Sequence, residues 1–128
     1  MVIRMDKPTY THITLECSGC PFSILNSLPV MRELLRSVAR KCDLHVVKEG
    51  FHRFRPQGIT GYLLLRESHI SVHTWPETGF ALIDVLSCRD IDVNELHTVL
   101  SDELGPKNIN LSIHTKKNVP RPGREKSR

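Results

Sequence analysis

The chain has 128 residues, 39% of them hydrophobic and 25% charged, with a formal net charge of +4. This length and composition suit one compact domain with a single core. No apolar run approaches the roughly 20 residues that cross a bilayer, and the polar first ten residues do not resemble a secretory signal. We therefore expect a cytoplasmic protein that does not bind membranes.

The positive charge gathers at the C-terminal end. Residues 115–128 hold six Lys and Arg residues against one Glu, and the rest of the chain is close to neutral. A basic, proline-containing segment of this kind predicts a disordered tail. We therefore place the folded domain at 1–114, with the tail at 115–128, and we expect no specific nucleic-acid partner.

The first half of the domain begins with alternating polar and apolar residues, which predict a strand over Thr11 to Cys17. A loop rich in Ser, Gly, Cys and Pro follows at 18–29. The next segment predicts a helix, since Pro29 suits a first turn and apolar residues then recur at helical spacing: Met31, Leu34, Leu35, Val38, Ala39 and Cys42.

Strands are predicted at 44–52, 60–66, 69–75 and 79–87, with turns at 56–58 and 76–79. A second helix is predicted from Val93 to Leu104, capped by Asp92 and ended by Gly105. Alternation at 109, 111 and 113 predicts a last strand. The order β-α-β-β-β-β-α-β predicts an α+β two-layer sandwich, in which a mainly antiparallel sheet carries two helices on one face.

The most informative segment is 66–77, which reads Arg-Glu-Ser-His-Ile-Ser-Val-His-Thr-Trp-Pro-Glu. Side chains alternate along a strand, so His69, Ser71 and His73 share one face, opposite Ile70 and Val72. The pattern alone favours a half-buried strand with a solvated polar face.

The residue identities in this segment are more informative than its alternation of polar and apolar side chains. It resembles the self-cleavage region of the prokaryotic S-adenosylmethionine decarboxylase proenzymes, which are pyruvoyl-dependent decarboxylases. The motifs that carry the resemblance are Glu67-Ser68-His69, His73-Thr74-Trp75-Pro76-Glu77, Gly79-Phe80-Ala81, Asp84 and Cys88, with Phe51-His52-Arg53-Phe54 and Gly58-Ile59-Thr60-Gly61 upstream and weaker matches at His12, Cys20 and Leu25. The similarity covers roughly residues 10–92.

The resemblance implies a self-processing enzyme. The chain would be cleaved between Glu67 and Ser68, and Ser68 would become a pyruvoyl group that forms a Schiff base with the substrate amine. No other cofactor and no metal is then needed. The implied reaction decarboxylates S-adenosylmethionine, giving the aminopropyl donor of spermidine biosynthesis. The implied assembly is a homodimer in which the sheets of two cleaved protomers meet.

The resemblance also assigns roles to single residues. It makes His73 the processing base, supported by Thr60, and Cys88 the proton donor in turnover. It places Phe54 and Glu77 against the adenine and ribose of the substrate. Thr60 stands where the family more often has Ser, and Arg89 follows Cys88 where Gly is usual. Without the family, His73 would be a hydrogen-bonded core histidine, Cys88 an apolar filler, Phe54 a core ring and Glu77 a turn carboxylate.

Three other interpretations stay open at this point. The same self-processing machinery could decarboxylate arginine or ornithine, or an uncleaved homologue could act as a regulatory partner. The Cys17-x-x-Cys20 spacing could belong to a zinc-binding module, although His69 and His73 would lie roughly 13 Å apart on a strand, too far to bind one ion. All four cysteines, at 17, 20, 42 and 88, are expected to be thiols.

Overall fold

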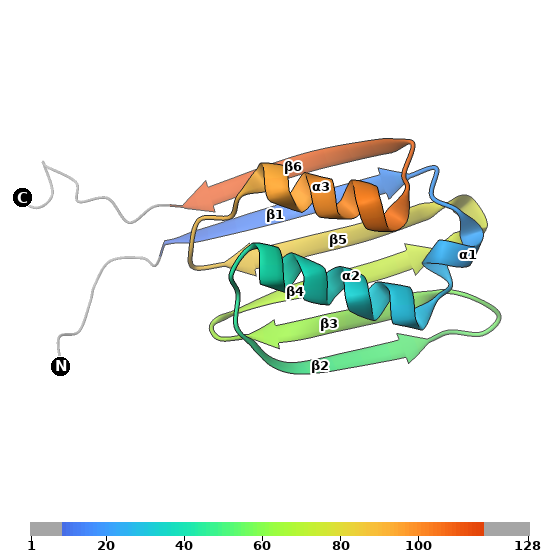
Figure 1. The fold of residues 1–128 in the computed structure, drawn as a ribbon, viewed down its shortest axis with the longest axis horizontal. Helices are drawn as coiled ribbons and strands as arrows, with labels where there is room; N and C mark the ends of the chain where they lie inside the picture. Colours follow the sequence, from blue (N-terminus) through green and yellow to red (C-terminus); the bar gives the residue numbers. More distant parts are fainter. Residues whose placement is uncertain (1–8, 117–128) are drawn as a thin grey trace, which may run out of the picture.

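The computed structural model describes residues 9–116. Its elements follow the predicted order closely (Figure 1): β1 (Tyr10–Ser18), α1 (Phe22–Leu25), α2 (Leu28–Lys41), β2 (Val46–Arg53), β3 (Ile59–Leu65), β4 (Ser68–Trp75), the 3-10 helix η1 (Pro76–Thr78), β5 (Phe80–Ser87), α3 (Val93–Leu104) and β6 (Asn108–Lys116). The α+β prediction is confirmed.

The strands form one sheet in the order β2-β3-β4-β5-β1-β6, and every neighbouring pair is antiparallel. The first strand of the chain therefore lies inside the sheet, between β5 and β6. This pairing places Thr14 of β1 and Ser71 of β4 on either side of Asp84. Residues far apart in the sequence thus become neighbours at the centre of the sheet.

Helices α2 and α3 cover one face of the sheet, as predicted (Figure 1). The core lies between the two layers, and each fully buried Leu or Ile contributes roughly 1.5–3 kcal/mol. Its largest fully buried side chains come from both helices and from the sheet, among them Leu34, Leu35, Leu96, Leu100, Ile13, Leu15, Leu63, Ile70 and Ile83.

The ends of the two long helices have the expected caps. Ser27 Oγ accepts a hydrogen bond from the Val30 amide, one residue after Pro29 in the first turn of α2. Asp92 accepts from two amides at the start of α3, and Gly105 ends that helix with φ +57°. Glycine adopts this left-handed conformation without the clash of a Cβ atom.

Four local features differ from the sequence-based expectation. The predicted loop at 18–29 contains the short helix α1, and the predicted turn at 76–79 contains η1. β2 begins at Val46 rather than at 44. Strand β6 runs to Lys116, two residues past the domain boundary placed at 114, and the remainder of the predicted tail, 117–128, lies outside the described residues.

The sheet face opposite the helices carries no other element of the described chain (Figure 1). His69, Ser71 and His73 point to this open face and are half-buried, while Ile70 and Val72 are fully buried on the helix side. The predicted alternation of β4 is therefore confirmed. Tyr62 and Leu64 of β3 share the open face and are 40% and 43% exposed.

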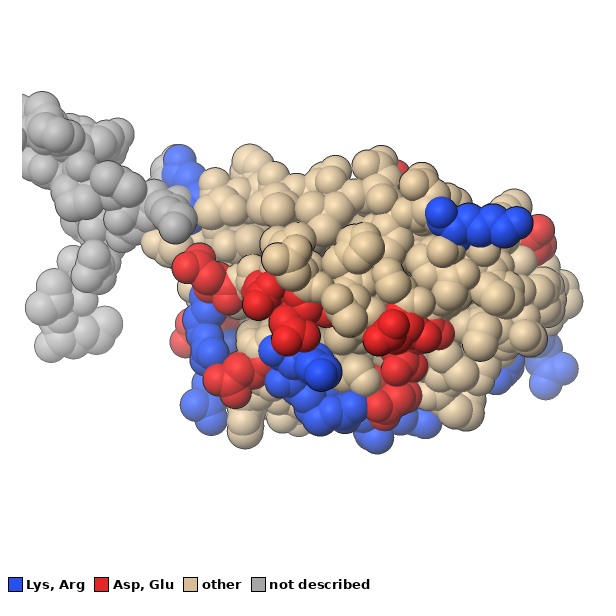
Figure 2. Space-filling model, turned by 45° about the horizontal axis from the view of Figure 1, so that its top comes forward, with Lys and Arg blue, Asp and Glu red and all other residues tan. Residues whose placement is uncertain are grey.

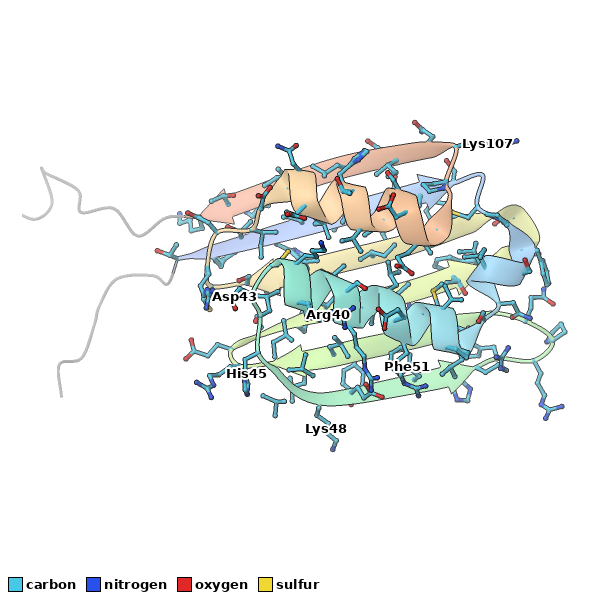
Figure 3. All side chains as sticks on the ribbon, in the orientation of Figure 1. Arg40, Asp43, His45, Lys48, Phe51 and Lys107 are labelled. Atoms are coloured by element: carbon cyan, nitrogen blue, oxygen red, sulfur yellow. The ribbon has the colours of Figure 1, made fainter. Side chains whose placement is uncertain are left out.

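The helix-bearing side is an ordinary solvated surface. Figure 2 shows acidic and basic side chains interspersed over it. Glu49 of β2 binds both Arg32 and Arg36 of α2, and Arg40, labelled in Figure 3, pairs with Glu33 on the same helix. Within residues 9–116, no helix is both long enough and apolar enough to cross a membrane.

Candidate active site

Glu67 and Ser68 lie in the tight connection between β3 and β4. Leu65 pairs with Ser68, so only Arg66 and Glu67 form the turn. Glu67 has φ +64°, in the left-handed region, which a residue with a Cβ atom adopts at a cost of roughly 1–3 kcal/mol. The unfavourable backbone conformation falls on the residue whose carbonyl group forms the Glu67–Ser68 peptide bond.

Cys88 lies directly opposite this turn. β4 and β5 are antiparallel with His69 facing Leu86, and the same register continued by two residues sets Cys88 opposite Glu67. Its exposed thiol donates a hydrogen bond to the Glu67 carbonyl oxygen, with a sulfur–oxygen distance of 3.3 Å. A donor at this oxygen stabilises negative charge that develops on it during nucleophilic attack.

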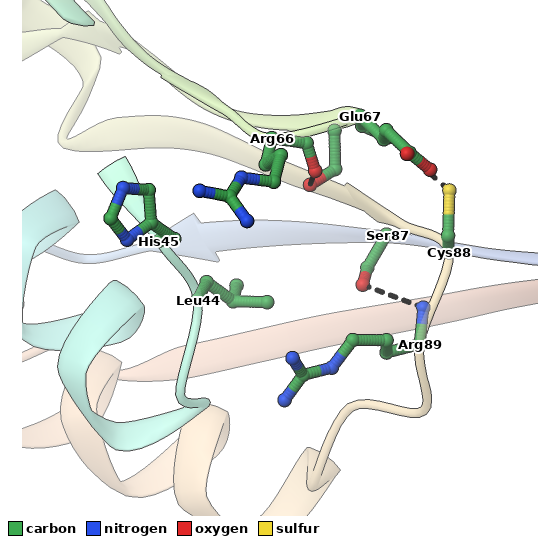
Figure 4. A pocket seen from close by; sticks show the side chains of 8 residues that line it. Leu44, His45, Arg66, Glu67, Ser87, Cys88 and Arg89 are labelled. Atoms are coloured by element: carbon green, nitrogen blue, oxygen red, sulfur yellow. Dashed lines mark hydrogen bonds between the residues drawn. The ribbon is translucent and has the colours of Figure 1, made fainter. Parts of the chain in front are cut away.

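A cavity of about 260 Å³ surrounds this end of the sheet, and Figure 4 shows the residues that line it: Leu44, His45, Arg66, Glu67, Ser68, Ser87, Cys88 and Arg89. Asp43 and His45 come from the connection between α2 and β2 (Figure 3). Arg89 donates to the exposed carboxylate of Asp43 at 3.3 Å, and its amide donates to Ser87 Oγ. The guanidinium group of Arg89 therefore lies at the rim of the cavity.

The predicted processing base lies at the opposite end of β4. His73 faces Thr60 across the β3–β4 ladder, and 3.1 Å separates the Thr60 hydroxyl from His73 Nδ1. The expected contact between these two residues is therefore present. Thr60 therefore supplies a hydroxyl group beside the imidazole of His73.

Phe54 and Glu77 lie beside His73. A second cavity of about 300 Å³ is lined by Phe54, Gln57, Gly58, Thr60, His73, Thr74, Trp75 and Glu77. Phe54 is 47% exposed, so its ring is available for stacking and is not part of the core. The exposed Glu77 carboxylate accepts a hydrogen bond from Gln57 at 3.3 Å.

The predicted site residues thus form two groups within one protomer. Glu67, Ser68 and Cys88 lie at one end of the sheet, whereas His73 and its neighbours lie at the other. Ser68 and His73 are five residues apart on an extended strand, which corresponds to roughly 16 Å. His73 cannot take a proton from Ser68 of the same protomer over this distance, because general-base catalysis needs hydrogen-bond reach.

A third group was not among the site residues predicted from the sequence. This group, the Asp84 cluster, consists of Asp84, His12, His69 and Ser71. Asp84 Oδ2 accepts from His12 Nε2 at 2.8 Å and from His69 Nε2 at 3.1 Å, and Oδ1 accepts from Ser71 Oγ. Burial raises the pKa of Asp84, but these hydrogen bonds outweigh burial and lower the pKa overall. The sequence does indicate that these side chains lie on the outward faces of three predicted strands. Without the order of the strands in the sheet, however, it does not indicate that they lie next to one another.

Cys17 and Cys20 are buried in the core. Burial, reinforced by the neighbouring Cys20 thiol, raises the pKa of Cys17 to about 12, and burial also raises the pKa of Cys20. All four cysteines are free thiols. Among residues 9–116 no group of three His, Cys, Asp or Glu side chains is placed to hold a metal ion.

Comparison with known proteins gives a consistent result. The family model described as S-adenosylmethionine decarboxylase matches residues 11–117. A protein of Carboxydothermus hydrogenoformans named S-adenosylmethionine decarboxylase proenzyme is 36% identical over 97 residues, which is 75% of this chain and 76% of that protein. A Prochlorococcus marinus protein of the same name is 41% identical over 98 residues, covering 76% of this chain and 78% of the relative.

The fold has a similar counterpart among solved structures. The crystal structure of the adenosylmethionine decarboxylase from Aquifex aeolicus superposes with a TM-score of 0.79 at 31% sequence identity. The similarity covers 89% of this chain and 95% of that one.

Proposed function

This chain belongs to the S-adenosylmethionine decarboxylase family, and we propose that it is a self-cleaving enzyme that converts S-adenosylmethionine to decarboxylated S-adenosylmethionine. Its product serves as the aminopropyl donor for spermidine. The observation that carries the proposal is the contact between the Cys88 thiol and the carbonyl oxygen of Glu67, directly before Ser68. A nucleophile, an unfavourable backbone conformation and an oxyanion donor then meet at one peptide bond.

Activation begins with the hydroxyl of Ser68. Its oxygen attacks the carbonyl carbon of Glu67, and a base takes the hydroxyl proton. The base passes this proton to the amide nitrogen of Ser68, which leaves as an amine and gives an ester. Removal of the Ser68 α-proton then expels the Glu67 carboxylate and leaves a dehydroalanine. Water hydrolyses this group to a pyruvoyl group and releases ammonia.

The residues at this end of the sheet fit such a group. Ser68 lies beside the cavity that Cys88 and Arg89 line, and its backbone is held by the pairing with Leu65. The pyruvoyl group supplies an electron sink for the bond that breaks when carbon dioxide leaves. Cys88 then holds a thiol proton next to this position, as needed to protonate the product carbon.

The two separated groups support a homodimer. In an isologous dimer whose open sheet faces meet with their strands reversed, the Ser68 end of one protomer faces the partner subunit's His73, Thr60, Phe54 and Glu77. The exposed Tyr62 and Leu64 offer apolar surface on this face. The cavities of about 260 and 300 Å³ are small for a site that binds a whole substrate, which is consistent with a site completed by a second protomer.

Phe54 and Glu77 support a nucleoside substrate. An accessible ring next to an accessible carboxylate can stack on adenine and bind ribose hydroxyls, contacts that arginine and ornithine do not need.

Release of labelled carbon dioxide tests the substrate. The processed enzyme should release it from carboxyl-labelled S-adenosylmethionine, and not from arginine or ornithine assayed in parallel. Turnover of either amino acid alone would contradict the proposed substrate and keep the self-processing chemistry. A wild-type chain that stays uncleaved would instead indicate a regulatory homologue.

A further inference from the structure

The Asp84 cluster joins three neighbouring strands on the open face of the sheet. Asp84 lies on β5, His69 and Ser71 lie on β4, and His12 lies on β1. The Asp84 side chain is only 20% exposed. Since its lowered pKa keeps the carboxylate ionised at neutral pH, all three hydrogen bonds go to a charged acceptor, and such bonds are stronger than neutral ones.

The position of His69 relates this cluster to the reaction. His69 directly follows Ser68, so after cleavage it is the residue that carries the group formed from Ser68. Cleavage also removes the covalent link between β3 and β4, because that link is the turn made by Arg66 and Glu67. A chain end that is not tied down frays, and its opening free energy falls towards zero.

We propose that the Asp84 cluster holds the new N-terminal end of β4 in register after self-cleavage, which keeps the group formed from Ser68 beside Cys88. This inference rests on the proposed function. Asp84, His12 and Ser71 act through His69 and the backbone of β4, so they are positioning residues and do not touch the reacting atoms.

The geometry makes the cluster suited to this task. Two of its three hydrogen bonds come from the first four residues of β4, so they restrain the segment that cleavage frees. The third comes from His12 on the opposite side of Asp84 and restrains the carboxylate itself. The backbone ladders with β3 and β5 remain after cleavage, but they do not restrain the side chain of His69.

Hydrogen exchange measured by mass spectrometry tests the inference without any turnover. In the processed enzyme, Asp84→Asn should speed exchange of the amides at 69–71 by about 10-fold. The same substitution in the uncleaved Ser68→Ala chain should have a much smaller effect, because the intact turn still holds β4. Glu16→Gln is the matched control, since Glu16 lies on the same face and accepts from Asn110 of β6 rather than contacting β4.

Measurements of kcat and KM, including those of a conservative variant, provide a second test of the inference. Asp84→Asn and His69→Ala should lower kcat by about 10- to 100-fold, the loss expected for a small misplacement of a reacting group, with a smaller change in KM. His69→Gln should retain most of the activity, because its amide nitrogen can occupy the position of Nε2. His69→Asn should not, because its shorter amide reaches only the position of Nδ1.

The outcomes separate this inference from the proposed function. If the wild type stays uncleaved, the proposed function is wrong and the inference falls with it. If the wild type is cleaved, an equal effect of Asp84→Asn on exchange in the cleaved and uncleaved chains would overturn the inference alone. Should Asp84→Asn fail to fold or to cleave, the His69→Ala and His69→Gln pair is compared by the same exchange experiment, and equal exchange in the two would overturn it.

Discussion

The thiol of Cys88 lies 3.3 Å from the carbonyl oxygen of Glu67, although 21 residues separate the two in the chain. The antiparallel register of β4 and β5 creates this contact. The residue implied as proton donor in turnover therefore also touches the bond proposed to break during activation.

Substitutions of Cys88 should separate these two tasks. Cys88→Ala should slow cleavage by only a few fold, because a thiol is a weak hydrogen-bond donor. The same change should lower kcat by about 10²- to 10⁴-fold, the usual contribution of a general acid. Gel electrophoresis follows cleavage into fragments of 67 and 61 residues, and carbon dioxide release follows turnover. Cys42→Ala serves as the control, and a larger loss in cleavage than in turnover would contradict this division.

A co-expression experiment tests whether each site uses two protomers. Ser68→Ala and His73→Ala should each remain uncleaved alone, the latter with some ester that hydroxylamine cuts. In a mixed dimer, the His73→Ala chain keeps its own Ser68 and obtains the partner subunit's His73. Co-expression should therefore restore cleavage of the His73→Ala chain, distinguished by an affinity tag. Continued absence of cleavage in an isolated mixed dimer would rule out the shared site.

The four cysteines should differ sharply in reactivity. Burial raises the pKa of Cys17, Cys20 and Cys42, so these thiols resist ionisation, whereas Cys88 is exposed. The thiolate is the reactive form. Iodoacetamide at neutral pH should therefore label Cys88 first, as read by peptide mass spectrometry, and labelling should abolish turnover. First labelling at Cys20 would show that the loop after β1 opens.

Acid should remove the stabilisation that Asp84 provides. Burial raises the Asp84 pKa, but hydrogen bonds from Ser71, His12 and His69 lower it overall from an ordinary value near 3.8. A carboxyl group whose pKa is lower in the folded state than in the unfolded state stabilises the fold. This stabilisation is complete when the pH is above the unfolded-state pKa. It is lost as the pH falls through the folded-state pKa. In the Ser68→Ala background, the difference in free energy of unfolding between Asp84 and Asp84→Asn should be constant above about pH 5 and shrink below about pH 3.8. Urea denaturation at several pH values measures it, and a constant difference down to pH 2.5 would contradict this assignment.

Local sequence patterns determined the type and order of the major elements. Alternation along β4, the apolar stripe of α2 and the caps at Ser27 and Asp92 depend on neighbours within a few residues, so one sequence suffices to predict them. The short α1 and η1 were missed, since each spans only three or four residues and has no periodicity to detect. The motif around Glu67 and Ser68 can likewise be recognised from the sequence alone, because its residues lie in one continuous segment.

Only the tertiary structure decided where the chemical groups lie relative to one another. The place of β1 between β5 and β6 depends on hydrogen bonds between strands that are distant in the chain, and local periodicity carries no information on such pairing. That pairing brings His12 to Asp84. The register of β4 against β5 brings Cys88 to Glu67. The rigid extension of β4 keeps Ser68 and His73 roughly 16 Å apart, although only four residues intervene, because an extended strand rises by about 3.3 Å per residue.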